Sequence, residues 1–227
     1  MKSKSYIIIG FVVLVFGIIF IPKIVDRISN GSVVDRDRHA VGTKKMEVED
    51  LLKMGKVPSF SFVNQHNDTI TNADYDGKVY VVEFFFTTCP SICPIMNANM
   101  VKLQNRFKGK EDFAIASFTI NPENDTPEVL KKYAEDHKVT NPNWNFLTGD
   151  MSQVYKLSNT GFNLYAEENE NVNGGFEHSG LFALIDRNGY IRSRPDEFGN
   201  PIVYYDGTTD EGVKMIEEDI ALLLNKE

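Results

Sequence analysis

The two cysteines of this sequence are the residues whose type and spacing are best suited to chemistry. Three residues separate Cys89 and Cys93 in Phe84-Phe85-Phe86-Thr87-Thr88-Cys89-Pro90-Ser91-Ile92-Cys93-Pro94, and the 227-residue chain has no other cysteine. An apolar run precedes the pair and a helical pattern follows it, which predicts a strand, a short loop and a helix. A redox dithiol usually has the spacing C-x-x-C, whereas C-x-x-x-C changes how the two sulfur atoms face each other. Two thiolates that converge on one point form a soft site, which suits Cu(I) or Zn(II).

A third ligand is expected elsewhere, because two sulfur atoms rarely complete a metal site. The four histidines of the chain are His39, His66, His137 and His178. His178 is the best placed, since it lies where a polar loop turns into the apolar strand predicted over residues 181–185. His137 ends a predicted helix, where an imidazole favours the negative end of the dipole, and the remaining two lie in polar segments. Cys89, Cys93 and His178 are therefore the candidate metal ligands.

Two further residues near the cysteines have both a functional and a structural interpretation. Met96 falls in the first turn of the helix that follows Cys93, where its thioether could be a weak ligand. A methionine beside a core more often serves packing. Asp125 precedes Thr126-Pro127-Glu128, a typical helix start. Its carboxylate could serve that turn, or it could support the metal-binding loop from outside the ligand set.

Three segments of the sequence resemble the Sco/SenC family of membrane-anchored, copper-binding proteins that assemble cytochrome c oxidase. They are residues 88–94, residues 121–128, and His178-Ser179 ahead of Leu184-Ile185-Asp186. A C-P-x-x-C-P core with a downstream D-T-P-E is far more specific than a lone cysteine pair, and the resemblance runs from about Pro58 to the C-terminus. The sequence departs from the family pattern at Asn121, where Asp is usual, and at Glu177, where many members have Asp before the histidine. Neither change removes a ligand.

The resemblance implies a function and a location for the chain. Cys89, Cys93 and His178 would hold one copper ion, as Cu(I) or Cu(II), and hand it to the dinuclear copper centre of cytochrome c oxidase subunit II. The protein would be single-pass in the cell inner membrane, with its soluble domain facing the periplasm.

A thiol–disulfide oxidoreductase that reduces partner cysteines is the alternative function, with Cys89 and Cys93 as the redox-active pair. Thioredoxin-type reductases place a cis-proline before the strand that faces the dithiol, and residues 177–180 contain no proline. The two roles are compatible, because copper loading of an oxidised partner requires its thiols to be reduced first. A peroxidase of the same fold is a weaker alternative. Its chemistry needs an Arg beside the attacking cysteine, and the sequence has no clearly placed one. A purely structural disulfide would close a loop too short to constrain much of the unfolded chain.

The pattern of elements predicts an α/β, thioredoxin-like fold, in which a central mixed sheet is flanked by helices and preceded by an N-terminal β-hairpin. The nearly continuous apolar run over residues 78–86 predicts a central strand covered on both faces. Residues 166–175 are acidic and Asn-rich, end in Gly-Gly, and are expected to form a flexible loop that delivers His178. The other strands are expected at residues 58–63, 69–71, 113–120, 144–148, 181–185 and 190–194, and the helices at residues 94–107, 126–137, 151–160 and 210–224.

The N-terminal segment predicts a membrane anchor. Residues 6–22 carry no charge and reach the ~17-residue lower limit for a helix that spans the hydrocarbon core. No small-residue cleavage site follows the run, and no cysteine that could carry a lipid follows it, so we expect an uncleaved signal anchor. The Lys/Arg distribution does not fix its orientation. The expected organisation is a transmembrane anchor over residues 1–25, a polar tether over residues 26–56 and the copper-binding domain over residues 57–227.

The charge is distributed unevenly along the chain. The net charge is −8, although residues 1–45 carry eight Lys/Arg against three Asp, so the remainder is strongly acidic. An acidic domain has no electrostatic reason to bind the phosphate backbone of a nucleic acid, and no nucleic-acid partner is expected.

Overall fold

A computed structural model of the chain describes residues 3–29, 46–172 and 174–225. These residues belong to two compact units, Met1–Met46 and Glu47–Glu227. The first unit contains helix α1 (Ser3–Ser29), which has Pro22 inside it. Among the described residues, none of the helices combines the length and the apolar character that crossing a membrane requires. The transmembrane helix predicted over residues 1–25 is therefore not confirmed. Residues 30–45 of the predicted tether lie outside the described residues.

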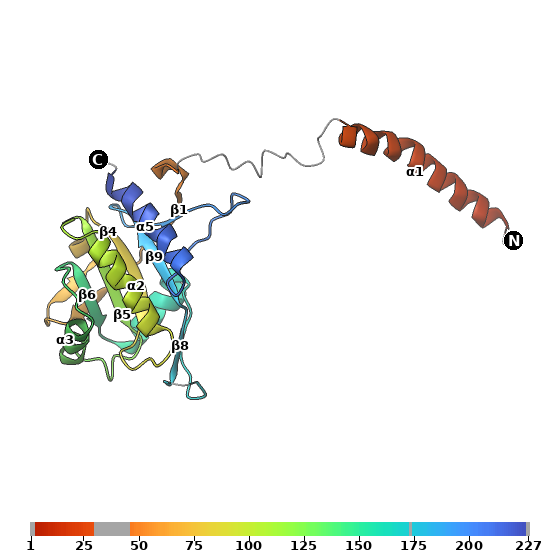
Figure 1. Ribbon diagram of the computed structural model, residues 1–227. Coiled ribbons are helices and arrows are strands. Elements are labelled where there is room, and N and C mark those ends of the chain that lie inside the picture. The colour runs from red at the N-terminus through yellow and green to blue at the C-terminus, as the bar shows by residue number, and fades with distance from the viewer. Residues whose placement is uncertain (1–2, 30–45, 173, 226–227) are drawn as a thin grey trace. The chain divides into compact units, whose positions relative to one another are not determined.

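The second unit is built on a nine-stranded sheet (Figure 1) with the order β1-β10-β9-β4-β5-β6-β2-β3, in which β11 also pairs with β9. Strands β4, β5 and β6 run parallel and the other pairings are antiparallel, so the predicted mixed sheet and the N-terminal hairpin β2–β3 are confirmed. The strands are β1 (Leu52–Lys56), β2 (Ser61–Asn64), β3 (Thr69–Thr71), β4 (Val79–Phe85), β5 (Phe113–Thr119), β6 (Trp144–Thr148), β9 (Leu181–Ile185), β10 (Tyr190–Ser193) and β11 (Tyr205–Asp206).

Helices α2 (Cys93–Arg106) and α3 (Pro127–Asp136) lie on the same face of the sheet. Both connect parallel strands in one direction along the sheet, and such crossovers are right-handed, which places both helices on one side. Helix α5 (Asp210–Asn225) packs against α2 on this face (Figure 1). The other face is covered in part by α4 (Met151–Tyr155) and the π-helical segment Lys156–Phe162, whose Phe162 ring packs edge-on against Phe84.

Strand β4 forms the centre of the core, and all seven of its residues are buried. Phe84, Phe85 and Phe86 are at most 2% exposed, which confirms that the aromatic run serves packing. One residue of this strand is not apolar, since Glu83 lies between Val82 and Phe84 with none of its surface exposed.

The polar tether predicted over residues 26–56 ends earlier than expected. A short 3-10 helix (Val48–Asp50) and strand β1 belong to the folded unit, and β1 pairs with β10 through Lys53 and Arg192. Leu51 is 2% exposed, and the Arg192 guanidinium donates to the carbonyls of Val48 and Leu51. The folded unit therefore begins at about residue 47 and not at residue 57. Burial of Leu51 and the hydrogen bonds from Arg192 stabilise this added segment.

Candidate metal centre

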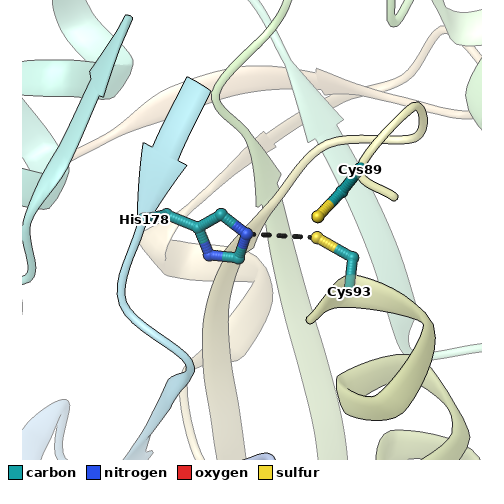
Figure 2. Close-up of side chains that lie close together, drawn as sticks. All are labelled: Cys89, Cys93 and His178. Atoms are coloured by element: carbon teal, nitrogen blue, oxygen red, sulfur yellow. Dashed lines mark hydrogen bonds between the residues drawn. The ribbon is translucent and has the colours of Figure 1, made fainter. Parts of the chain in front are cut away.

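Three side chains from separate parts of the unit converge at one end of β4. The sulfur atoms of Cys89 and Cys93 and a ring nitrogen of His178 all lie within 4.8 Å of one another. Figure 2 shows the His178 imidazole directed at the two sulfur atoms, and Cys93 Sγ is 3.1 Å from His178 Nε2. Both cysteines are free thiols. The structure therefore brings together all three residues that the sequence predicts as ligands.

Each of these side chains is positioned by the element that carries it. Cys89 lies in the loop that follows β4, where its N–H donates to the Phe86 carbonyl at 3.3 Å. Cys93 is the first residue of α2, and Pro94 follows it at a position where the helix needs no N–H donor. His178 ends the short strand β8 (Phe176–His178), just before β9, and β9 pairs directly with β4. Because β9 pairs with β4, His178 lies beside the cysteine loop that follows β4.

The hydrogen bonding of His178 leaves one nitrogen available as a ligand. Its Nδ1 lies 3.0 Å from the carbonyl oxygen of Ser179. A carbonyl only accepts, so Nδ1 carries the hydrogen and donates it, and Nε2 keeps its lone pair on the side of the thiols. Such a bond also fixes the ring orientation and raises the basicity of the ligating nitrogen. The Phe86 ring packs edge-on against the imidazole, with 5.8 Å between the two ring centroids.

The two thiols differ in protonation. The pKa of Cys89 is lowered to about 3, first by a hydrogen bond from the Cys93 thiol and further by the backbone N–H groups of Cys93 and Ser91, against the effect of burial. The pKa of Cys93 is raised, because the shared bond with Cys89 favours its protonated form and because it is 1% exposed. A cysteine at a helix start favours the thiolate, but here the lowered pKa belongs to Cys89, on which more donors converge.

This difference predicts that the cysteines react unequally with an alkylating agent. In the metal-free, reduced protein the rate of Cys89 carbamidomethylation by iodoacetamide should be nearly constant above about pH 5, because the thiolate is already formed there. Cys93 should stay unmodified until the protein is unfolded. Mass spectrometry of peptides after timed labelling measures both rates, and the urea-unfolded protein is the control. A Cys89 rate that still climbs steeply through about pH 8, as for an ordinary thiol, would contradict the assignment.

Comparison with known proteins identifies the family. The family model described as SCO1/SenC matches residues 50–209. The chain belongs to the SCO1/SenC family. It is 33% identical over 138 residues to the SCO1 protein homolog of Bacillus subtilis, a match that covers 60% of this chain and 71% of that protein.

Solved structures of SCO1/SenC proteins confirm the mixed α/β, thioredoxin-like fold. A SCO1/SenC family lipoprotein from Bacillus anthracis has a TM-score of 0.66 at 32% identity, covering 76% of this chain and 96% of that one. BsSco, described as a member of the Sco family of cytochrome c oxidase assembly proteins with a disulfide switch, has a TM-score of 0.66 at 28% identity, covering 80% and 100%. ScoI of Bradyrhizobium japonicum, solved with copper bound, shares the fold with a TM-score of 0.56 at 21% identity, covering 71% and 98%.

The segment expected to be a flexible loop in this SCO1/SenC chain is an antiparallel hairpin of β7 (Ala166–Glu168) and β8. Its tip rests on the cysteine loop. Gly174 has a φ of +99°, and a Cβ atom there would lie 2.9 Å from Pro90 Cδ, so only glycine allows this approach. The hairpin and the cysteine loop together enclose a hollow of about 380 Å³, lined by Cys89, Ser91, Ile92, Tyr165, Val172, Phe176, Glu177, His178 and Ser179.

Hydrogen bonds to the Asp125 side chain connect the cysteine loop to the end of β5. Its side chain is fully buried and accepts hydrogen bonds from the Thr87 N–H at 3.0 Å and from the hydroxyls of Thr87 and Thr119. The cap of α3 is instead provided by Thr126, whose hydroxyl accepts from the Val129 N–H. Of the two interpretations of Asp125, the geometry favours support of the loop that carries Cys89.

Neither of the other described histidines belongs to the cluster of Cys89, Cys93 and His178. His66 is exposed in the turn after β2, and His137 ends α3 with its Nδ1 2.8 Å from the Tyr133 carbonyl. His39 lies outside the described residues. Met96 is fully buried in the core, as expected for a packing residue. Sequence reasoning missed Glu83, for which the one available signal was a carboxylate inside an otherwise apolar strand.

Proposed function

We propose that the protein binds one copper ion through Cys89, Cys93 and His178. The convergence of two thiols and an imidazole within 4.8 Å carries the proposal. This donor set fits copper, because thiolates select soft Cu(I) while imidazole also suits Cu(II). A copper-bound Sco protein of the same fold supports the choice of metal.

We infer that the copper is passed to a cytochrome c oxidase, with the dinuclear centre of subunit II as the receiving site. Three protein ligands leave a coordination position that an incoming ligand can occupy. The hollow beside Cys89 gives a partner side chain access to this position. Membership of the SCO1/SenC family, together with the description of BsSco as a cytochrome c oxidase assembly protein, supports the choice of partner.

A titration of the metal-free, reduced protein with Cu(I) tests the proposed copper site. We expect one copper per chain, retained against a chelator of known affinity, and a charge-transfer absorption from thiolate to metal when Cu(II) is added. A wild-type protein that takes up no copper under these conditions would leave thiol chemistry as the remaining function of the pair.

Thiol–disulfide exchange with a partner is the second candidate function, and one observation favours it. Cys89 is 8% exposed and has a lowered pKa, while Cys93 is 1% exposed and has a raised pKa. A thiolate that attacks and a more deeply buried thiol that resolves the mixed disulfide are the two parts such an exchange needs. Both functions use the same pair of sulfur atoms, so copper would block the exchange.

We also propose that the N-terminal segment holds the protein in the cell inner membrane, with the domain on the periplasmic side. The uncharged run of residues 6–22 supports the anchor, and membership of the SCO1/SenC family supports the orientation. We expect the protein to remain in the membrane fraction after a high-salt wash and to keep Met1 or Lys2 at its N-terminus. N-terminal sequencing of the extracted protein is the measurement, and a mature chain that starts near residue 25 would show that the segment is cleaved.

A further inference from the structure

Strand β8 has an open edge. In an antiparallel pair, the backbone groups of every second residue point away from the partner strand. The bond of 2.8 Å from the Asn169 N–H to the Gly175 carbonyl, together with the register of β7 and β8, fixes which residues these are. The N–H and C=O groups of Phe176 and His178 point away from β7. In the described part of the chain, these four groups have no hydrogen-bond partner.

The opposite edge of the same hairpin is closed. On β7, the Ala166 N–H donates to Asn159 Oδ1 at 2.8 Å, and the Ala166 carbonyl accepts from Asn159 Nδ2 at 2.8 Å. A side-chain amide thus occupies the place that a further strand would take. The residues of β8 are partly exposed, and none of the described side chains covers its outward backbone groups in this way. An unpaired strand edge is a template for pairing with another chain.

The hollow beside the cysteine loop follows this open edge. Residues 176–179 all line it, although successive side chains of a strand point to opposite faces. A hollow that touches residues of both faces lies along the edge of the strand. The cysteine loop contributes Cys89, Ser91 and Ile92 to the same hollow. An extended segment that pairs with β8 would therefore bring its side chains next to Cys89.

The charge around the edge favours a basic occupant. Four glutamates lie on the hairpin: Glu167, Glu168, Glu170 and Glu177. The sequence has no Lys or Arg over residues 163–186 and no charged residue over residues 87–101, which include the cysteine loop. A second copy of this chain would bring the same carboxylates to the edge, so repulsion between like charges opposes pairing of two copies. A segment that carries Lys or Arg is attracted instead.

We propose that the open edge of β8 docks an extended, basic, cysteine-containing segment of the protein that receives the copper. The inference rests on the copper delivery proposed above. The backbone of the segment exchanges hydrogen bonds with Phe176 and His178, its Lys or Arg side chains lie against the glutamates of the hairpin, and its cysteine enters the hollow beside Cys89. In this mode of recognition, backbone pairing gives affinity and alternate side chains give specificity. The receiving sulfur is thereby placed next to a copper ligand.

A peptide tethered to Cys89 tests the docking on the metal-free, reduced full chain that carries Cys93→Ser. The probe is Lys-Val-Cys-Val-Lys, capped at both ends and activated at its cysteine as a pyridyl disulfide. The Cys89 thiolate attacks the peptide sulfur, a mixed disulfide forms and pyridinethione leaves. Amide hydrogen exchange resolved to single residues then reports strand pairing. We expect exchange of the Phe176 and His178 amides to slow on the order of 10-fold, while the Glu177 amide, already paired with β7, changes little.

Two matched peptides separate backbone pairing from charge. Lys-Pro-Cys-Pro-Lys keeps the charge and the tether but lacks the two N–H groups beside its cysteine, so it should give no protection. Glu-Val-Cys-Val-Glu keeps the backbone donors and should protect less than the lysine peptide, most clearly at low salt. Equal exchange of the Phe176 and His178 amides with the lysine–valine and the proline peptides would overturn the docking. Equal protection by the glutamate and lysine peptides would overturn the choice of a basic partner.

Phe176→Pro blocks the edge in the protein itself, because it removes an outward N–H that no strand of the chain uses. Phe176→Ala is the matched control, since it loses the same ring packing against Phe86 but keeps the N–H. With the lysine peptide tethered, the His178 amide should stay protected in Phe176→Ala and lose its protection in Phe176→Pro. Protection that persists in Phe176→Pro would overturn the docking, and the peptide comparison decides it if that variant does not fold.

The same two variants, with both cysteines restored, distinguish this inference from the proposed copper site. Each keeps all three ligands, so each should still bind one copper. The exchange measurement requires no metal. A wild type that takes up no copper would therefore contradict the proposed function, whereas unprotected Phe176 and His178 amides in a chain that binds copper would contradict the docking alone.

Discussion

Cys89→Ser and Cys93→Ser variants are expected to lose stoichiometric copper binding altogether. Either change leaves one thiolate and one imidazole, and a serine hydroxyl is a hard, weak ligand for Cu(I). The loss of affinity should exceed the ~10–100-fold that follows when an outer-shell partner of a metal ligand is removed. Equilibrium competition with a Cu(I) chelator, followed by metal analysis of the desalted protein, measures it.

His178→Ala should give a different result from the cysteine variants. The two thiolates remain and still form a soft site, so Cu(I) binding should weaken without disappearing. Cu(II), which depends more on the imidazole, should be lost more completely. If the affinities of His178→Ala for Cu(I) and Cu(II) fall by the same factor, His178 Nε2 is not a ligand, although it lies 3.1 Å from Cys93 Sγ.

Two other histidine variants serve as controls for the ligand set. His66 is exposed in a turn, and His137 is held at the end of α3 by the Tyr133 carbonyl, so His66→Ala and His137→Ala should leave copper stoichiometry unchanged. Copper binding that stays near one per chain after either cysteine is replaced would show that the proposed site is wrong.

The ligands could be predicted from the sequence because each one lies at a boundary that the local sequence pattern shows. Cys89 follows an apolar strand, Cys93 begins a helix, and His178 comes just before the apolar run of β9. Strand pairing then places the three together. The central strands, covered on both faces, carry continuous apolar runs that show where they begin and end.

Features that depend on tertiary contacts could not be predicted in this way. Strand β1 is exposed along most of its length, so its sequence has no alternation, and its pairing depends on Arg192 far along the chain. The β7–β8 hairpin contains acidic and Asn residues that are typical of a loop, and its tip meets the cysteine loop where Gly174 approaches Pro90. The thiolate lies on Cys89 and not on Cys93, because burial and shared hydrogen bonds outweigh the position at the helix start.

Asp125→Ala is expected to weaken both the fold and the copper site. The carboxylate satisfies the Thr87 N–H and two threonine hydroxyls in a fully buried position. Leaving a buried donor without its partner costs about 1–3 kcal/mol, and three donors lose their partner here, so we expect the free energy of unfolding to fall by about 3 kcal/mol or more. Urea unfolding of the metal-free protein measures this change.

The copper affinity of the same variant should fall about 10–100-fold, as for other partners that orient ligands from outside the ligand set. Thr87 stands two residues before Cys89, so releasing it frees the loop that aims this thiolate at His178. Asp125→Asn keeps one acceptor oxygen and should lie between the wild type and Asp125→Ala in both measurements.

Asp150→Ala is the control for the removal of a hydrogen-bonded carboxylate elsewhere. Asp150 is exposed and caps α4 by accepting from the Gln153 N–H at 3.0 Å, so its loss should lower stability slightly and leave the copper affinity unchanged. If Asp125→Ala loses stability but keeps the wild-type copper affinity under conditions in which it is folded, the carboxylate stabilises the domain without positioning Cys89. A loss of affinity in the folded variant would instead mean that Cys89 depends on Asp125 for its orientation toward the metal.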